Sequence, residues 1–166
     1  MDRMYADSSR LLTAQEEKVA REVFQRTLPY SAIRVIPRAG LGNRPYTSNN
    51  VGLDDRGPTY HLNVGQNMYG GMTKSQLWRW TMIHELTHVW QSCHDEWPAA
   101  FIFKSLGCQI VGGMSAYQYT DGQPWDSYNV EQQASIVSDW YDRGQKETSV
   151  LYRYIRDEIR TVKTFP

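Results

Sequence analysis

The chain has 166 residues, and its 18 Lys and Arg side chains balance 18 Asp and Glu, which leaves a formal net charge of zero. This balance argues against nucleic-acid and anionic-membrane partners, which usually require a basic surface. No apolar run reaches the roughly 18 residues of a transmembrane helix. None follows the first charged residues either, so we expect no signal peptide and synthesis in the cytoplasm. The length is typical of a single domain, which we place over 1–166.

The first part of the chain is predicted to form one helix and two short strands. Thr13 and Glu16 have the spacing of a capping box, in which each side chain bonds the other residue's backbone N–H, so a helix begins there. Short strands are expected over 32–36 and 60–64, where apolar and polar residues alternate. The stretch 38–58 is rich in Gly, Asn and Pro and is predicted to be a long loop.

The rest of the chain is predicted to be mainly helical. A second capping-box pattern, from Thr73 to Gln76, opens a helix that continues to about Ser92. The remaining predicted elements are a short helix over 98–106, a short strand over 117–119, a helix over 130–142 with Asn129 as N-cap, and a charged amphipathic helix over 147–162. These segments predict an α+β domain that is mainly helical, with a small sheet and the helix from Thr73 at its centre.

His84, Glu85 and His88 form an H-E-x-x-H motif on this central helix. Residues four apart lie about 40° apart around an α-helix and about 6 Å apart along it, so both imidazoles can reach one ion. Glu85 lies beside them and can take a proton from a water that the ion activates. The flanking residues from Thr81 to Trp90 are otherwise uncharged, which suits a buried metal helix. A surface helix with weak His–Glu pairs is the simpler alternative.

A catalytic zinc site needs a third protein ligand, and two residues are candidates. His94 follows His88 by six residues, as in the metzincin pattern, but Gln91 replaces the Gly that lets the chain leave the helix toward the metal. A continuing helix would turn His94 away. Glu131 begins a separate predicted helix, as in gluzincins, although a first-turn Glu is also favoured by the helix dipole alone. We favour Glu131 over His94.

These segments also resemble a known family. HELTHVWQ at 84–91, followed by YNVEQQA at 128–134, is similar to the zincin metallopeptidase domains fused to Rhs and VgrG spike proteins of bacterial type VI secretion systems. The resemblance covers mainly residues 73–141. It implies a zincin-like fold centred on the H-E-x-x-H helix.

The resemblance also implies a chemistry and a setting. One Zn²⁺ per chain is held by His84, His88 and Glu131, and Glu85 is the general base when a zinc-activated water attacks a peptide bond. The chain is then a secreted antibacterial effector, a toxin domain that a secretion system delivers to the periplasm of target cells. Its expected partners are a protein or peptide substrate, a secretion-spike carrier and a cognate immunity protein.

Two other functions use the same residues. A cell-wall peptide amidase shares the metal chemistry but not the substrate. A non-catalytic zinc-stabilised binding module needs a fourth ligand, for which Cys93 and His94 are the nearby candidates.

Two cysteines, Cys93 and Cys108, are too few for a disulfide scaffold, and we expect reduced thiols. A DNA-linked protease is disfavoured by the zero net charge.

Five further residues are weaker candidates for the site. Tyr117, Tyr119 or Tyr128 could donate a hydrogen bond to a tetrahedral oxyanion, although aromatic packing is the simpler role for each. Asp139, farther along the helix of the carboxylate ligand, could orient a ligand histidine, and His61 lies on a strand before the central helix. For both, a solvent-exposed position is the simpler alternative.

Overall fold

The computed structural model describes residues 8–50, 57–94 and 116–166. Helix α2 (Ala14–Phe24) is followed by β1 (Ile33–Ile36), β2 (Tyr46–Asn50), β3 (Thr59–Asn63) and the short helix α3 (Gly65–Tyr69). The long helix α4 (Gln76–His94) and α6 (Val130–Asp142) come next. The chain ends in α7 (Tyr152–Tyr154), which continues as a π-helical turn over Ile155–Ile159. Short 3-10 turns occupy Tyr30–Ala32, Leu41–Asn43 and Trp125–Ser127.

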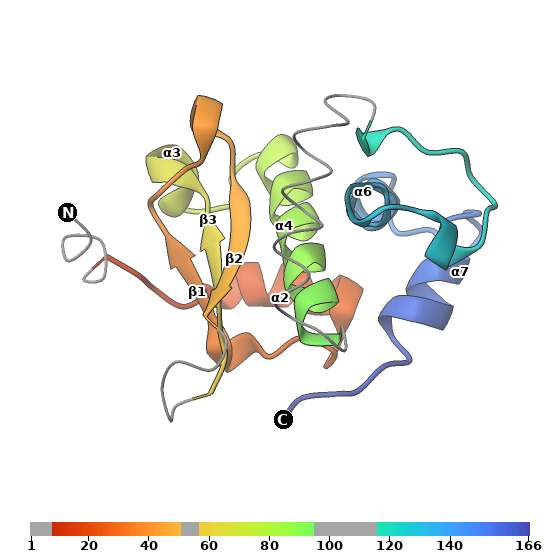
Figure 1. Cartoon of the computed structure of the whole chain (residues 1–166), viewed down its shortest axis with the longest axis horizontal. Helices are drawn as coiled ribbons and strands as arrows, with labels where there is room; N and C mark the ends of the chain where they lie inside the picture. The colour runs from red at the N-terminus through yellow and green to blue at the C-terminus, as the bar shows by residue number, and fades with distance from the viewer. Residues whose placement is uncertain (1–7, 51–56, 95–115) are drawn as a thin grey trace.

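Helix α4 lies between the sheet and α6 (Figure 1). The sheet has the order β1-β3-β2, with β1 parallel and β2 antiparallel to the central strand β3. Every residue of α4 from Met82 to Ser92 is buried, because β2 packs on one side of the helix and α6 on the other. The arrangement confirms the predicted α+β class. No helix in the described ranges is long and apolar enough to cross a membrane.

Two helices begin where the sequence predicts. Thr13 and Glu16 form a complete capping box at the start of α2, and Asn129 and Gln132 form another at the start of α6. In both boxes a side-chain oxygen accepts from a backbone N–H that the helix itself leaves without a partner. The second box fixes the direction in which α6 leaves the preceding turn.

The predicted capping box at Thr73 is wrong. Helix α4 begins at Gln76, and the Trp78 backbone N–H donates to Ser75 Oγ at 3.1 Å. A serine one residue before the helix therefore caps it alone, and Thr73 lies in the turn before it.

The predicted loop over 38–58 is also wrong in part, because it contains strand β2. The side chains that β2 directs at α4 are polar: Thr47 hydrogen-bonds to Glu85, and Asn49 Nδ2 donates to Ser92 Oγ at 2.6 Å. A strand whose inward residues are polar has no hydrophobic alternation, so the period-two signal is absent from this sequence.

The last predicted helix, over 147–162, is shorter than expected. Helical structure begins at Tyr152 and is preceded by turns. One reason is that the Lys146 carbonyl oxygen accepts a hydrogen bond from Trp140 Nε1 at 3.2 Å, which commits that backbone to a turn.

The strand predicted over 117–119 is wrong as well. Tyr117 lies in a 3-10 turn, and the Gln118 carbonyl accepts from Gln132 Nε2 at 2.6 Å rather than from another strand. The helix predicted over 98–106 and the thiol of Cys108 lie outside the described residues.

A buried ion pair joins the N-terminal segment to the chain that enters α4. The Glu16 carboxylate is fully buried and accepts from Arg10 at 2.7 and 3.0 Å, from the Thr13 N–H at 2.8 Å and from the Met72 N–H at 2.9 Å. Burial would raise the pKa of Glu16, but the bonds from Arg10 and the two N–H groups lower it below its ordinary value. Because Met72 precedes α4, this network helps to place the central helix.

We predict that Glu16→Gln destabilises the chain by about 2 kcal/mol at neutral pH, because charge-assisted bonds to a buried group are lost. A carboxylate with a lowered pKa stabilises the fold above its ordinary value of 4.5, and this contribution is lost as the pH falls through the folded value. Urea unfolding should therefore separate Glu16→Gln from wild type clearly at about pH 7 and less at about pH 3.

Glu17→Gln is the matched control. Glu17 lies on the same helix but pairs with Arg21 at the partly exposed surface, so its loss should cost less than about 0.5 kcal/mol. Equal destabilisation by the two variants would show that the buried network has no special role.

Candidate metal centre

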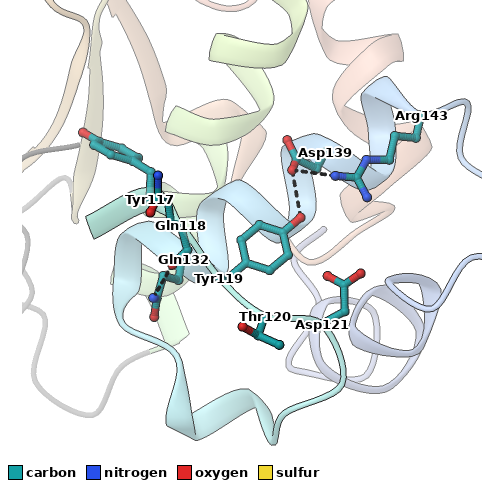
Figure 2. A pocket seen from close by; sticks show the side chains of 8 residues that line it. All are labelled: Tyr117, Gln118, Tyr119, Thr120, Asp121, Gln132, Asp139 and Arg143. Carbon is teal, nitrogen blue, oxygen red and sulfur yellow. Dashed lines mark hydrogen bonds and ion pairs between the residues drawn. The ribbon is translucent and has the colours of Figure 1, made fainter. Parts of the chain in front are cut away.

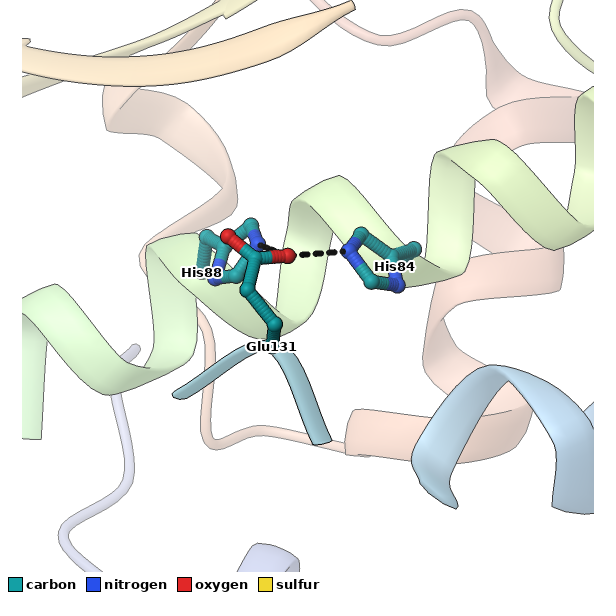
Figure 3. A group of neighbouring side chains, drawn as sticks. All are labelled: His84, His88 and Glu131. Carbon is teal, nitrogen blue, oxygen red and sulfur yellow. Dashed lines mark hydrogen bonds and ion pairs between the residues drawn. The ribbon is translucent and has the colours of Figure 1, made fainter. Parts of the chain in front are cut away.

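Helices α4 and α6 bring two histidines and a glutamate to one point (Figure 3). His84 Nε2 lies 3.1 Å from Glu131 Oε2, and His88 Nε2 lies 3.4 Å from the same oxygen. All three side chains are buried, and one possible ligand atom from each lies within 4.8 Å of the others. The three residues proposed as ligands from the sequence are thus neighbours in space. We call them the His-His-Glu cluster.

Glu131 is fully buried in the first turn of α6. The Asn129 cap sets the start of this helix, and the positive end of the helix dipole favours an anion there. Burial would raise the pKa of Glu131, but hydrogen bonds from His84 and His88 lower it instead. Glu131 is therefore an ionised carboxylate inside the protein, and such a group requires a cationic partner.

His88 has the complementary shift. Burial would lower the pKa of His88, but the hydrogen bond and charge of Glu131 raise it to about 9. A proton on His88 therefore balances the buried carboxylate at neutral pH when no metal is bound. Two imidazoles and a carboxylate are also a donor set of catalytic zinc sites, and a divalent cation would balance the same charge. The cluster fits a metal ion of this class.

Gln91 joins His88 on α4 to the start of α6. Its Oε1 accepts from His88 Nδ1 at 2.8 Å, and its Nε2 donates to the Val130 carbonyl at 3.0 Å and to Gln133 Oε1 at 2.9 Å. A donating Nδ1–H leaves Nε2 as the metal-binding nitrogen of His88. This role of Gln91 was not predicted from the sequence. The three-residue spacing from His88 was an available signal, but the partners on α6 were not visible in the sequence.

Trp80 supports His84 by stacking. The two ring centroids lie 5.0 Å apart with an interplanar angle of 22°. Within the described residues, His84 Nδ1 is buried without a hydrogen-bond partner, so on that side of the ring packing takes the place of a hydrogen bond, while Nε2 lies 3.1 Å from Glu131 Oε2. The two ligand histidines are thus positioned by different interactions.

The alternative ligand His94 is turned away from the cluster. Helix α4 continues through Gln91 to His94, as a glutamine in place of glycine predicts. His94 Nε2 lies 2.9 Å from the Thr27 carbonyl oxygen, to which it donates. Cys93 is a free thiol, and burial raises its pKa to about 12. Neither residue belongs to the cluster, so the described part of the chain offers no Cys or His that would close the site.

Strand β2 holds Glu85 beside the cluster. The Thr47 hydroxyl lies 2.8 Å from Glu85 Oε2 and 2.9 Å from the Glu85 carbonyl oxygen, and it donates to them. Glu85 is 6% exposed and lines a cavity of about 240 Å³ with His84 and Glu131. We call this the metal-site cavity. Its other lining residues are Arg44, Pro45, Trp80, Thr81 and Tyr117.

A larger hollow of about 840 Å³ lies along α6 and shares Tyr117 with the metal-site cavity (Figure 2). The Tyr119 hydroxyl donates to Asp139 Oδ2 at 2.8 Å, and the Tyr128 hydroxyl donates to a backbone carbonyl at 2.6 Å. Of the three tyrosines considered from the sequence, Tyr117 is the one that lines the same cavity as Glu85. The larger hollow contains none of the His-His-Glu cluster.

The other two weaker candidates lie away from the ligand atoms. Asp139 accepts from Trp80 Nε1 at 2.9 Å, so it acts on His84 through the stacked Trp80 ring and not by direct contact. His61 lies on β3, with Nε2 3.3 Å from Thr59 Oγ1, and lines neither cavity.

We predict that Gln91→Leu weakens zinc binding about 10- to 100-fold, the usual effect of losing a partner that orients a ligand histidine. Gln91→Glu keeps the oxygen that accepts from His88 Nδ1 and should recover most of the affinity. Competition against a chelator measures both values, and circular dichroism checks that the helices persist. Wild-type affinity in Gln91→Leu would mean that the bridge does not position His88.

No protein-family model matches the chain. The type VI secretion system spike protein VgrG2b of Pseudomonas aeruginosa strain PAO1 is 26% identical over 140 residues, which are 82% of this chain and 13% of that much longer protein. The solved structure of the effector domain of P. aeruginosa VgrG2b matches with a TM-score of 0.60 and 25% identity, over 87% of this chain and 81% of that one. The family resemblance expected from the two motifs is confirmed, and this chain is a homologue of the VgrG2b effector domain.

Proposed function

We propose that this chain is a zinc metallopeptidase and acts as an effector of a type VI secretion system. The single observation that carries the proposal is that His84 and Glu131 of the His-His-Glu cluster line one cavity with Glu85. Three protein ligands leave a coordination position open, which is the arrangement of catalytic rather than structural zinc sites. Zinc held there would supply Lewis acidity, which lowers the pKa of water and polarises a carbonyl group.

The residues around the cluster have distinct roles in this proposal. Glu85 takes a proton from the attacking water and returns it to the leaving amine. The Thr47 hydroxyl, 2.8 Å from Glu85 Oε2, holds that carboxylate in one orientation while the other oxygen meets the water. Tyr117, which lines the same cavity, donates a hydrogen bond to the oxygen that becomes negatively charged.

The two alternative functions differ in what they require. A structural zinc module needs a fourth ligand, and the candidates Cys93 and His94 have other contacts. A cell-wall peptide amidase would use the same residues, so only the substrate distinguishes it. Homology to a spike protein supports a secretion-spike carrier as partner. As further parts of the proposal, the destination is the periplasm of a target cell, and a cognate immunity protein protects the producing cell.

We predict that Glu85→Gln retains about one zinc per chain and the wild-type fold but loses activity by about 10²- to 10⁴-fold. Glutamine keeps the shape and can still accept from Thr47, but it cannot take up the proton. Activity is measured as toxicity of the chain directed to the periplasm of a Gram-negative host, and as hydrolysis of protein-derived and cell-wall-derived peptides by the purified chain.

Two further variants separate loss of metal from loss of chemistry. His88→Ala should lose the zinc and the activity together, whereas His94→Ala should keep both, because His94 contacts Thr27 and not the cluster. Full activity of zinc-loaded Glu85→Gln would exclude the proposed mechanism. Cleavage of cell-wall peptides without cleavage of protein peptides would favour the amidase.

We predict that Tyr117→Phe lowers kcat about 10- to 100-fold with little change in KM, because its hydrogen bond forms mainly in the transition state. Tyr119→Phe is the matched control: it also removes one phenolic hydroxyl, but that hydroxyl is bonded to Asp139 outside the metal-site cavity. Zinc content should be unchanged in both. An equal loss of kcat in the two variants would rule out a specific role for Tyr117.

A further inference from the structure

Arg44 places a positive charge in the lining of the metal-site cavity. It is exposed, and no hydrogen bond or ion pair of its guanidinium is found with the described residues. The arginines Arg10, Arg79 and Arg153, by contrast, are bonded to protein oxygens. Arg44 is therefore a cation at the mouth of the site whose bonding capacity is not used by the described part of the protein.

The backbone at Arg44 is held firmly although its side chain is not. The turn over Leu41–Asn43 has positive φ at Gly42 (68°) and Asn43 (58°), and the Gly40 N–H donates to the Arg44 carbonyl at 2.8 Å. Pro45 follows and restricts the next φ angle. The tight turn thus fixes the backbone of Arg44 just before β2, the strand that carries Thr47.

Charge balance in the cavity favours an anion. The two charges of a zinc ion would balance the Glu85 and Glu131 carboxylates, which leaves the Arg44 charge in excess. Arg44 lines this cavity together with Glu85, Glu131 and Tyr117, so its charge lies beside the groups of the proposed site.

We propose that Arg44 is a substrate-binding residue that pairs with a carboxylate on the peptide residue next to the scissile bond. This inference rests on the proposed metallopeptidase function and narrows its substrates to peptides with such a carboxylate. The carboxylate can belong to an acidic side chain or to a free C-terminus. Arginine suits either, because its planar fork of N–H donors matches both carboxylate oxygens.

A second role for Arg44, stabilisation of the oxyanion, makes a different prediction. An oxyanion group acts on every substrate alike, through kcat, because the charge that it meets forms only in the transition state. A carboxylate-binding group acts on the ground state and only on ligands that carry the carboxylate. Binding of substrate-like probes that cannot react therefore separates the two roles.

Mercaptoacetyl peptides are suitable probes, because their thiol binds an open zinc position and no bond is cleaved. One pair compares mercaptoacetyl-aspartate amide with mercaptoacetyl-asparagine amide and tests a side-chain carboxylate. The other compares mercaptoacetyl-alanine with its C-terminal amide and tests a terminal carboxylate. Affinities are measured by isothermal titration calorimetry on the zinc-loaded chain, after metal analysis has established its zinc content.

We expect the acid of one pair to bind wild type about tenfold more tightly than its amide, which is typical of a charge-assisted bond. Arg44→Gln should reduce this ratio to about one, and Arg44→Glu should invert it. The pair that responds identifies the source of the carboxylate. Because Arg44 is exposed, the ratio should also fall as salt concentration rises.

Arg26→Gln is the matched control. Arg26 is also exposed and the substitution changes the net charge equally, but Arg26 does not line the metal-site cavity. It should leave the acid-to-amide ratio unchanged. Equal affinities of acid and amide in both pairs, with zinc and thiol bound, would overturn the role of Arg44 alone. A chain that binds no zinc, or whose zinc binds no thiol, would overturn the metallopeptidase proposal and this inference with it.

Discussion

The rest of this structure depends on one interaction, the pairing of the buried Glu131 carboxylate with His84 and His88. An ionised group without solvent must be balanced by positive charge and hydrogen bonds. His84 and His88 both hydrogen-bond to Glu131, and His88, whose pKa is raised, supplies the charge. The requirement fixes the distance between α4 and α6, because the two imidazoles on one helix must meet a side chain from the first turn of the other. It also explains why α4 is buried along most of its length although it carries several polar residues.

Gln91 connects this electrostatic requirement to the geometry of the helices. A glycine at this position would let the chain leave the helix, and a histidine six residues after His88 could then turn back to the metal. Glutamine instead continues α4, sends His94 to the Thr27 carbonyl and bonds both to His88 and to the start of α6. Glutamine at this position therefore keeps His94 away from the cluster and connects His88 to the helix that carries Glu131.

The sequence predicted the parts of the molecule whose signals are local. The H-E-x-x-H spacing placed His84 and His88 together, and Asn129 as N-cap marked the start of α6. The choice of Glu131 as the third member of the cluster rested also on the family resemblance. Strand β2 was missed because Thr47 and Asn49 face polar partners on α4 and leave no hydrophobic alternation. Arg44 was missed for a related reason, since its place beside the site depends on how β2 lies against α4. The roles of Glu85 as base and of zinc as the ion stay predictions.

The position of the cluster also has a consequence for how the chain responds to its surroundings. His88 lies on α4 and Glu131 on α6, so an ion held between them would act as a reversible cross-link between the two helices. Its contribution to stability follows mass action and grows by about 1.4 kcal/mol for each tenfold rise in free zinc above the dissociation constant. The pairing of α4 with α6 would then be more stable where zinc is plentiful and less stable where chelators remove it. The stability of the fold would thus depend on the concentration of free zinc around the chain.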